Sequence, residues 1–171
     1  MRQLAMPLQR LDSIDGRGFL EIRSALRALR GVRPEANPDR VELLRDAAGA
    51  VAVFEEGESL IAVRTDKGTL LPSADARYLV ANADPLRSRR SLRGANIPLI
   101  ERAAIEFGKK LPFDFDEYVI AVVDDGPMRV VMLRDRDRDR REDEIGSAGR
   151  PSFEVGFDRE KFEVVKAHFS R

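Results

Sequence analysis

The sequence predicts an α+β protein in which helices pack on an antiparallel β-meander. Two observations support this class. In three segments the apolar residues recur at intervals of three and four, which is the spacing of one helical face. From residue 118 onward they instead form short β-branched or alternating runs, separated by acidic and glycine-containing turns. The chain has 171 residues, of which 43% are apolar, so it is long enough to fold unaided.

The first half of the chain is predicted to hold two helices behind an irregular leader. Residues 1–15 are interrupted by charges and a proline, and they lack the apolar run of a signal peptide. Apolar residues within 19–29 share one helical face and predict the first helix. Asn37 and Pro38 then supply an N-cap and a first-turn proline, so a second helix is predicted over 38–48.

A hairpin and a linker are predicted next. Apolar runs within 50–63 flank an acidic glycine turn, which is typical of a hairpin, and residues 75–82 fit either a strand or a short helix. The stretch 84–95 is basic and contains proline and glycine, so we interpret it as a linker. We therefore predict an N-terminal unit over 1–86 and a C-terminal unit over 96–171, unless one continuous sheet joins them into a single domain.

The C-terminal unit is predicted to be one helix followed by a four-stranded antiparallel meander. Asn96 caps the helix, Pro98 occupies its first turn and Gly108 closes it. The strands are predicted over 118–123, 128–133, 152–157 and 162–169.

The two halves show an internal echo. A helix at 38–48 and a hairpin at 50–65 precede the linker, and a helix at 97–108 and a hairpin at 118–134 follow it. The echo is compatible with a duplication. However, any helix followed by a hairpin with a polar turn gives the same pattern.

The composition excludes several kinds of site. The chain has no cysteine, which excludes disulfides, thiolate nucleophiles and cysteine-bound metals. His168 is the only histidine, and the sequence contains no nucleophile elbow and no phosphate-binding glycine loop. We therefore expect no cofactor. No apolar run approaches the roughly 20 residues that span a bilayer, and we expect a cytoplasmic protein without membrane association.

Two arginine-rich segments supply the candidate partner-binding residues. Residues 134–144 interleave five arginines with six acids, and in a strand this alternation would place arginines on one face. Residues 87–93 carry four arginines and no acid. The simpler interpretation is a solvated hairpin loop for the first segment and a linker for the second. The candidates are Arg134, Arg136, Arg138, Arg140 and Arg141, together with Arg87, Arg89, Arg90 and Arg93.

A third polar group lies in the sequence FDFDEY. Asp114, Asp116 and Glu117 are spaced so that two carboxylates could share a divalent cation. The alternative is a loop anchored by its two phenylalanines, with its acids facing water. The spacing is common and no EF-hand pattern surrounds it, so we favour the loop.

The C-terminal unit resembles the cystatin-like and NTF2-like arrangement, in which one helix lies across a curved antiparallel sheet. Within that group it is similar to small bacterial NTF2-fold immunity proteins. The resemblance rests on IERAAIEFGKK as the helix, on YVIAVV with MRVVMLRD as a hairpin, and on GRPSFEVGFDREKFEVVKAHFSR as the closing hairpin. It covers less than half of the chain and carries over no functional residue.

The function that we favour from the sequence is a non-enzymatic protein-binding module, such as a bacterial immunity or adaptor protein with a protein partner of unknown identity. The alternative is a small-ligand-binding or enzymatic NTF2-like domain that uses its concave sheet face. Its candidate groups would be Tyr118, Asp124, Asp125 and His168. Lysine plus arginine and aspartate plus glutamate both total 30, so zero net charge disfavours nucleic-acid binding.

Overall fold

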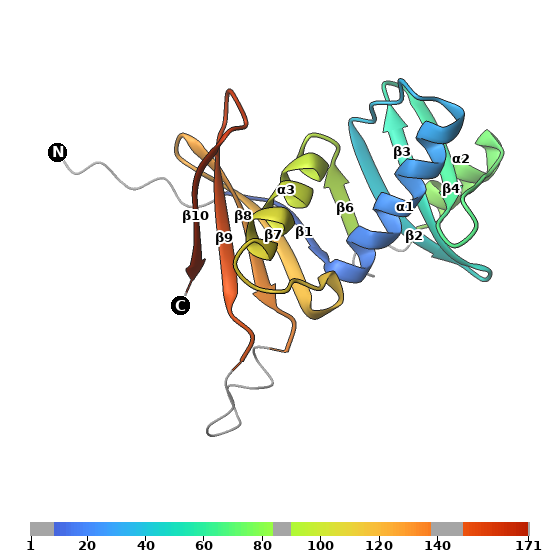
Figure 1. Cartoon of the computed structure of the whole chain (residues 1–171). Helices are drawn as coiled ribbons and strands as arrows, with labels where there is room; N and C mark the ends of the chain where they lie inside the picture. The colour runs from blue at the N-terminus through green and yellow to red at the C-terminus, as the bar shows by residue number, and fades with distance from the viewer. Residues whose placement is uncertain (1–8, 84–89, 138–148, 171) are drawn as a thin grey trace. The chain divides into compact units, whose positions relative to one another are not determined.

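The computed structural model describes residues 9–83, 90–137 and 149–170. The chain divides into two units, each with a five-stranded antiparallel sheet (Figure 1). Unit 1 comprises Met1–Gly16 and Asn96–Arg171, and unit 2 comprises Arg17–Ala95. The described residues form three α-helices and two antiparallel sheets, which confirms the α+β class. None of these helices is long and apolar enough to cross a membrane.

Unit 2 is a sheet with a helix on each face. Its strands run in the order β5-β4-β3-β2-β6, and α1 and α2 lie on opposite faces (Figure 1). The apolar face of α1 supplies Phe19, Ile22 and Leu29, all fully buried, while Ala76 of α2 packs against Val51 of β3. The elements are α1 (Gly16–Val32), β2 (Arg40–Asp46), β3 (Gly49–Glu56), β4 (Ser59–Arg64), β5 (Thr69–Leu70), α2 (Ser73–Ala81) and β6 (Arg90–Arg93).

Unit 1 is a sheet with the order β1-β7-β8-β9-β10 and α3 lying across it (Figure 1). Phe107 of α3 packs its ring against Tyr118, Phe153 and Phe169, with centroids 5.1–5.7 Å apart. These edge-on rings fill the sheet face beneath the helix. The elements are β1 (Gln9–Asp15), α3 (Asn96–Gly108), a 3₁₀ turn (Phe115–Glu117), β7 (Tyr118–Asp125), β8 (Met128–Asp135), β9 (Ser152–Asp158) and β10 (Val164–Ser170).

The predicted helices at 19–29 and 96–108 and the four C-terminal strands are confirmed. The predicted helix over 38–48 is wrong, because Arg40–Asp46 forms strand β2. This strand pairs with β3 on one edge and with β6 on the other. Val41 and Leu43 point into the core, and backbone pairing on both edges outweighs the local helix signal of Asn37 and Pro38.

The predicted leader and linker also differ from the structure. Residues 9–15 of the leader form β1, which pairs antiparallel with β7 and so belongs to unit 1. Residues 90–93 of the linker form β6, which pairs with β2. Residues 75–82, which fitted either element, are mostly helix α2. The boundary at residue 96 coincides with the start of α3 in unit 1.

The two units are built from the same succession of elements. Each has a helix followed by four strands, α1 with β2–β5 and α3 with β7–β10. The register matches as well: adding 79 to the residue numbers turns the β2–β3 pair Val41↔Phe54 into the β7–β8 pair Ile120↔Leu133. The helices match in burial. Phe19, Ile22, Ala25 and Leu29 of α1 correspond to Ile97, Ile100, Ala103 and Phe107 of α3.

The leading strand of each repeat adds to the sheet of the other repeat. β1 ends at Asp15 and continues directly into α1, yet it pairs with β7 of unit 1. β6 ends at Arg93 and leads into α3, yet it pairs with β2 of unit 2. The chain is therefore two strand–helix–four-strand repeats that have exchanged their first strands.

The predicted echo matches the wrong pairs of strands. It equated the hairpin at 50–65 with that at 118–134, whereas the register equates β2–β3 with β7–β8. The error follows from assigning β2 as a helix. When β2–β3 is aligned with β7–β8, unit 1 shows an insertion. Six residues separate the paired Phe54 and Ile61, but nineteen separate the equivalent Leu133 and Phe153. The mixed-charge segment 134–144 lies within this insertion.

A glycine marks the point where each exchanged strand ends. A Cβ on Gly16 would lie 1.6 Å from the carbonyl oxygen of Phe115, just before β7. A Cβ on Gly94 would lie 1.8 Å from the carbonyl oxygen of Pro38, just before β2. Gly94 also donates its N–H to Asp39 O at 2.8 Å. Both positions require glycine, because the backbones approach too closely for any side chain.

We predict that Gly94→Ala destabilises the protein by about 1–3 kcal/mol, because the new methyl group must push backbone away from backbone. Gly31→Ala is the matched control, since a Cβ there meets nothing within 4 Å in helix α1; it should stabilise the helix by up to about 1 kcal/mol. Urea unfolding of both variants measures the difference. Equal stability of the two variants would contradict the close approach at Gly94.

Candidate functional site at the end of strands β8 and β9

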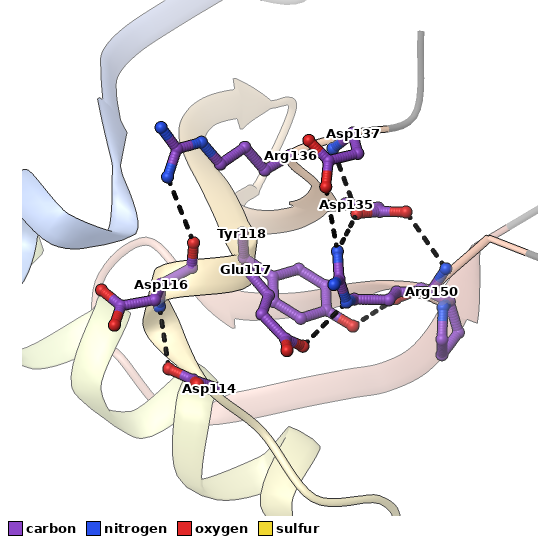
Figure 2. Close-up of polar contacts among 9 residues, drawn as sticks. Asp114, Asp116, Glu117, Tyr118, Asp135, Arg136, Asp137 and Arg150 are labelled. Carbon is purple, nitrogen blue, oxygen red and sulfur yellow. Dashed lines mark hydrogen bonds and ion pairs between the residues drawn. The ribbon is translucent and has the colours of Figure 1, made fainter. Parts of the chain in front are cut away.

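A polar cluster lies where β8 leaves the sheet of unit 1 and β9 re-enters it (Figure 2). The Arg150 guanidinium contacts Glu117 Oε2 at 2.8 Å, Asp135 Oδ1 at 3.0 Å and Asp137 Oδ2 at 3.4 Å. We call these four residues the Arg150 clamp. It joins the last turn before β7, the end of β8 and the approach to β9.

Asp135 is the buried centre of the clamp. Strand alternation places it on the α3 side of the sheet, two residues after buried Leu133, and its side chain is only 2% exposed. Its Oδ1 accepts from Arg150 Nη1 and from the Asp137 N–H at 3.2 Å, and its Oδ2 accepts from the Arg150 N–H at 3.1 Å. Three donors and a cation therefore offset the cost of burying this carboxylate.

The charge of Arg150 is secured by its partners. Burial by itself would lower the pKa of the Arg150 guanidinium, but its hydrogen bond to Asp135, the charge of Glu117 and its contact with Asp137 raise that pKa above the ordinary value. The guanidinium therefore stays protonated and acts as a fixed cation rather than as an acid or base.

Tyr118 lies beside the clamp with its ring in the core. Its hydroxyl donates to the carbonyl oxygen of Pro151 at 3.0 Å. Burial raises the pKa of Tyr118 to about 12, and the negative charges of Asp135 and Glu117 act in the same direction. The phenol is therefore neutral at physiological pH and ties the start of β7 to the segment that precedes β9.

The acids of FDFDEY do not converge. Asp114 Oδ1 accepts from the Asp116 N–H at 3.0 Å and so caps the 3₁₀ turn, whereas Glu117 turns toward Arg150. Within residues 9–83, 90–137 and 149–170, no group of three or more histidine, aspartate or glutamate side chains could hold a metal ion. The loop interpretation of this segment therefore fits the geometry better than the cation site does.

The structure separates the predicted arginines. Arg134 and Arg136 are exposed at the end of β8, while Asp135 is buried against Arg150 and Asp137, 42% exposed, also contacts Arg150. Arg90 and Arg93 lie on β6 in unit 2. The remaining candidates Arg87, Arg89, Arg138, Arg140 and Arg141 lie outside the described residues.

The groups named for a ligand-binding face are not brought together. Asp124 pairs with Arg129 Nε at 2.9 Å, and Asp125 is exposed at the end of β7. His168 is an exposed residue of β10, with Nε2 3.8 Å from Glu154 Oε2. Tyr118 faces the ring cluster beneath α3. The rings that fill this face leave these four groups without a common space.

Sequence reasoning missed a second polar network in unit 1. Asn96 at the start of α3 donates to the buried carboxylate of Asp12 in β1 and accepts from Arg129 Nη1 at 3.1 Å. Arg129 in turn binds Asp124, which also lies 3.5 Å from Arg159. This network of two cations and two anions fastens β1 and α3 to β7 and β8. The signal in the sequence that could have indicated this network was a charged residue at a strand position whose side chain faces the core.

A depression of about 510 Å³ lies between the turns that follow β7 and β9, lined in part by Gly126 and Pro127. The polar groups that line it form hydrogen bonds within the two turns. Asp158 Oδ1 accepts from the N–H groups of Glu160 and Lys161, which lower the pKa of the Asp158 carboxyl. Arg159 donates to Gly126 O at 3.1 Å. We interpret this depression as the space between two hairpin turns.

Comparisons of the chain with protein-family models, with curated proteins and with solved structures gave no match.

The described side chains around the Arg150 clamp carry more acid than base. Three guanidiniums and five carboxylates of described residues lie there, and Figure 2 labels all of them except Arg134. The guanidiniums belong to Arg134, Arg136 and Arg150, and the carboxylates to Asp114, Asp116, Glu117, Asp135 and Asp137. Because the clamp pairs Arg150 with some of these acids, the exposed charges of both signs are held at defined positions.

We predict that Asp135→Asn destabilises the protein by about 1–3 kcal/mol, because the new amide group would direct a donor at the Arg150 donors. Asp125→Asn, at an exposed position of the same hairpin, should change stability by less than about 0.5 kcal/mol. Urea unfolding measures both. Similar values for the two variants would show that Asp135 is not the centre of the clamp.

We also predict a loss of stability at alkaline pH that depends on Tyr118. The folded-state pKa of about 12 exceeds the ordinary value of 10.0, so the stabilising contribution is complete below pH 10 and is lost as the pH rises toward 12. Tyr118→Phe should weaken the dependence of the unfolding midpoint on pH over this interval. It should also cost about 1 kcal/mol at neutral pH through the lost hydrogen bond. Identical alkaline profiles for the variant and the wild type would contradict the raised pKa.

Proposed function

We propose that this protein is a non-enzymatic protein-binding module, and that the charged end of unit 1 is its binding surface. The observation that carries the proposal is the Arg150 clamp, which buries Asp135, holds Asp137 beside Arg150 and leaves Arg134 and Arg136 exposed. In the sequence these charges largely cancel, but the clamp withdraws Asp135 from the surface while Arg134 and Arg136 on either side of it stay exposed.

The exposed charges suit recognition of a charged protein surface. Arg134 and Arg136 are exposed at the end of β8, and Arg136 Nη1 lies 3.5 Å from the carbonyl oxygen of exposed Asp116 (Figure 2). A fixed pattern of both signs selects a complementary partner and speeds encounter more than it adds affinity. Because the clamp holds the strand end in place, less ordering is needed on binding. The exposed Arg134 and Arg136 favour a partner surface that places acidic groups opposite them.

The finer class that we propose is an immunity or adaptor protein of NTF2-like or cystatin-like type. Its support is the arrangement of α3 across β7–β10 (Figure 1). The alternative, an enzymatic or ligand-binding use of the sheet face, would need the volume that Phe107, Tyr118 and Phe153 occupy. A toxin gene beside the coding gene would favour immunity over an adaptor role.

The experiment compares capture of a partner by the full chain and by the double variant Arg134→Glu/Arg136→Glu from lysate of the native host. We expect a specific protein that is retained at about 0.1 M salt and released near 1 M, where the Debye length falls to about 3 Å. The charge-reversed variant should retain at least tenfold less of this protein.

Arg102→Glu is the matched control, because Arg102 is an exposed arginine of α3 in the same unit. It should capture the partner as the wild type does. Equal retention by the double variant would remove the end of β8 from the binding surface. Retention that does not change with salt would exclude electrostatic recognition.

A further inference from the structure

Strand β10 is the outer strand of the sheet of unit 1. Its neighbour in the sheet is β9, with which it pairs from Val164↔Phe157 to Ser170↔Ser152, with a shift of register at Val165, between Val164 and Lys166. The opposite edge of β10 presents backbone N–H and C=O groups along a strand of seven residues. Such an edge can receive another strand, and proteins that must avoid this usually shorten or cover it.

The internal repeat shows that the same edge is blunted in unit 2. The counterpart of β10 is β5, which follows β4 as β10 follows β9. β5 is only two residues long, and Pro72 follows soon after it and leads into α2. Proline cannot donate to a ladder, so β5 offers little for another strand to pair with. The long edge is therefore specific to unit 1.

Exposed apolar side chains accompany this edge. Val165 is 58% exposed and Phe169 is 38% exposed, although both belong to a strand. They lie two residues to either side of Ala167. Two copies of β10 placed antiparallel about Ala167 would therefore set Val165 of each copy opposite Phe169 of the other. Aromatic residues opposite β-branched residues are favourable cross-strand pairs.

We propose that β10 pairs with β10 of a second copy of this chain, antiparallel about Ala167, and joins two five-stranded sheets into one. The exposed Val165 and Phe169 are covered in this pairing, and the outer backbone edge of each β10, which has no strand beside it among the described residues, is satisfied. Lys166 lies opposite His168 of the second copy in this pairing. A single strand pair is a small interface, and the dimer is consequently a weak one.

The first test places one cysteine on the proposed two-fold axis, since the chain has no cysteine of its own. Residues directly opposite each other in antiparallel strands have Cα atoms about 4.5–5.5 Å apart, which is within the range that a disulfide bridges. Ala167→Cys should therefore form a covalent dimer on mild oxidation.

Ser170→Cys is the matched control on the same strand. It lies three residues from the axis, so the two copies would be roughly 20 Å apart. It should stay monomeric under the same oxidation. Equal cross-linking of the two variants would overturn the proposed register, and no cross-linking of Ala167→Cys would overturn the pairing.

The second test needs no cysteine. Sedimentation equilibrium of the full chain should show a dimer that dissociates on dilution, and Val165→Lys should raise its dissociation constant at least tenfold. Val32→Lys is the control, because Val32 is 66% exposed on α1 of unit 2, whereas β10 belongs to unit 1. It should leave the dimer unchanged. A wild-type chain that stays monomeric at the highest soluble concentration, or a dimer that Val165→Lys does not weaken, would refute the proposal.

Discussion

The exchange of leading strands is the constraint on which the rest of this structure depends. β1 completes the sheet of unit 1, although the chain then leaves for α1, and β6 completes the sheet of unit 2 before the chain enters α3. Each sheet therefore includes one strand that precedes the helix of the other unit in the sequence. At the end of each exchanged strand, Gly16 or Gly94 allows two backbone segments to come closer than a side chain would permit. Neither half of the chain contains all the strands of either sheet, so the folding of the two units is coupled.

Because the two repeats share the same succession of elements, their differences show where unit 1 and unit 2 have diverged. Unit 2 has a two-residue edge strand and uses α2 to cover the sheet face formed by Val51, Val53 and Ala62. Unit 1 keeps a long edge strand and carries thirteen additional residues between β8 and β9, counted between equivalent paired positions. An insertion of that length opens the end of a sheet unless something closes it. The Arg150 clamp does so by tying Asp135 at the exit to Arg150 at the return.

The spacing of apolar residues predicted the correct element wherever that element is determined by its own residues. The spacing of Phe19, Ile22 and Leu29 predicted α1, and the run from Tyr118 to Val123 predicted β7. It failed where pairing across the chain decides the element. Val41 and Leu44 suit one helical face as well as they suit a strand, and β2 is a strand because β3 and β6 lie on its two edges. β1 has the mostly polar sequence QRLDSID, and its partner β7 lies more than one hundred residues away. Such pairings leave no local periodicity.

The candidate site was predictable in part for the same reason. The alternation of arginine and aspartate indicated which side chains would share a face, and exposure over residues 134–137 follows it. Nothing local distinguished Arg150, a single arginine between glycine and proline, as the cation that binds those aspartates. A count of charges gives segment 134–144 almost no net field, whereas burial of Asp135 at 2% side-chain exposure removes one carboxylate from the surface and fixes its neighbours. The charges exposed at this end of unit 1 are thus set by which charges the core retains, and this depends on a contact between the two ends of an insertion.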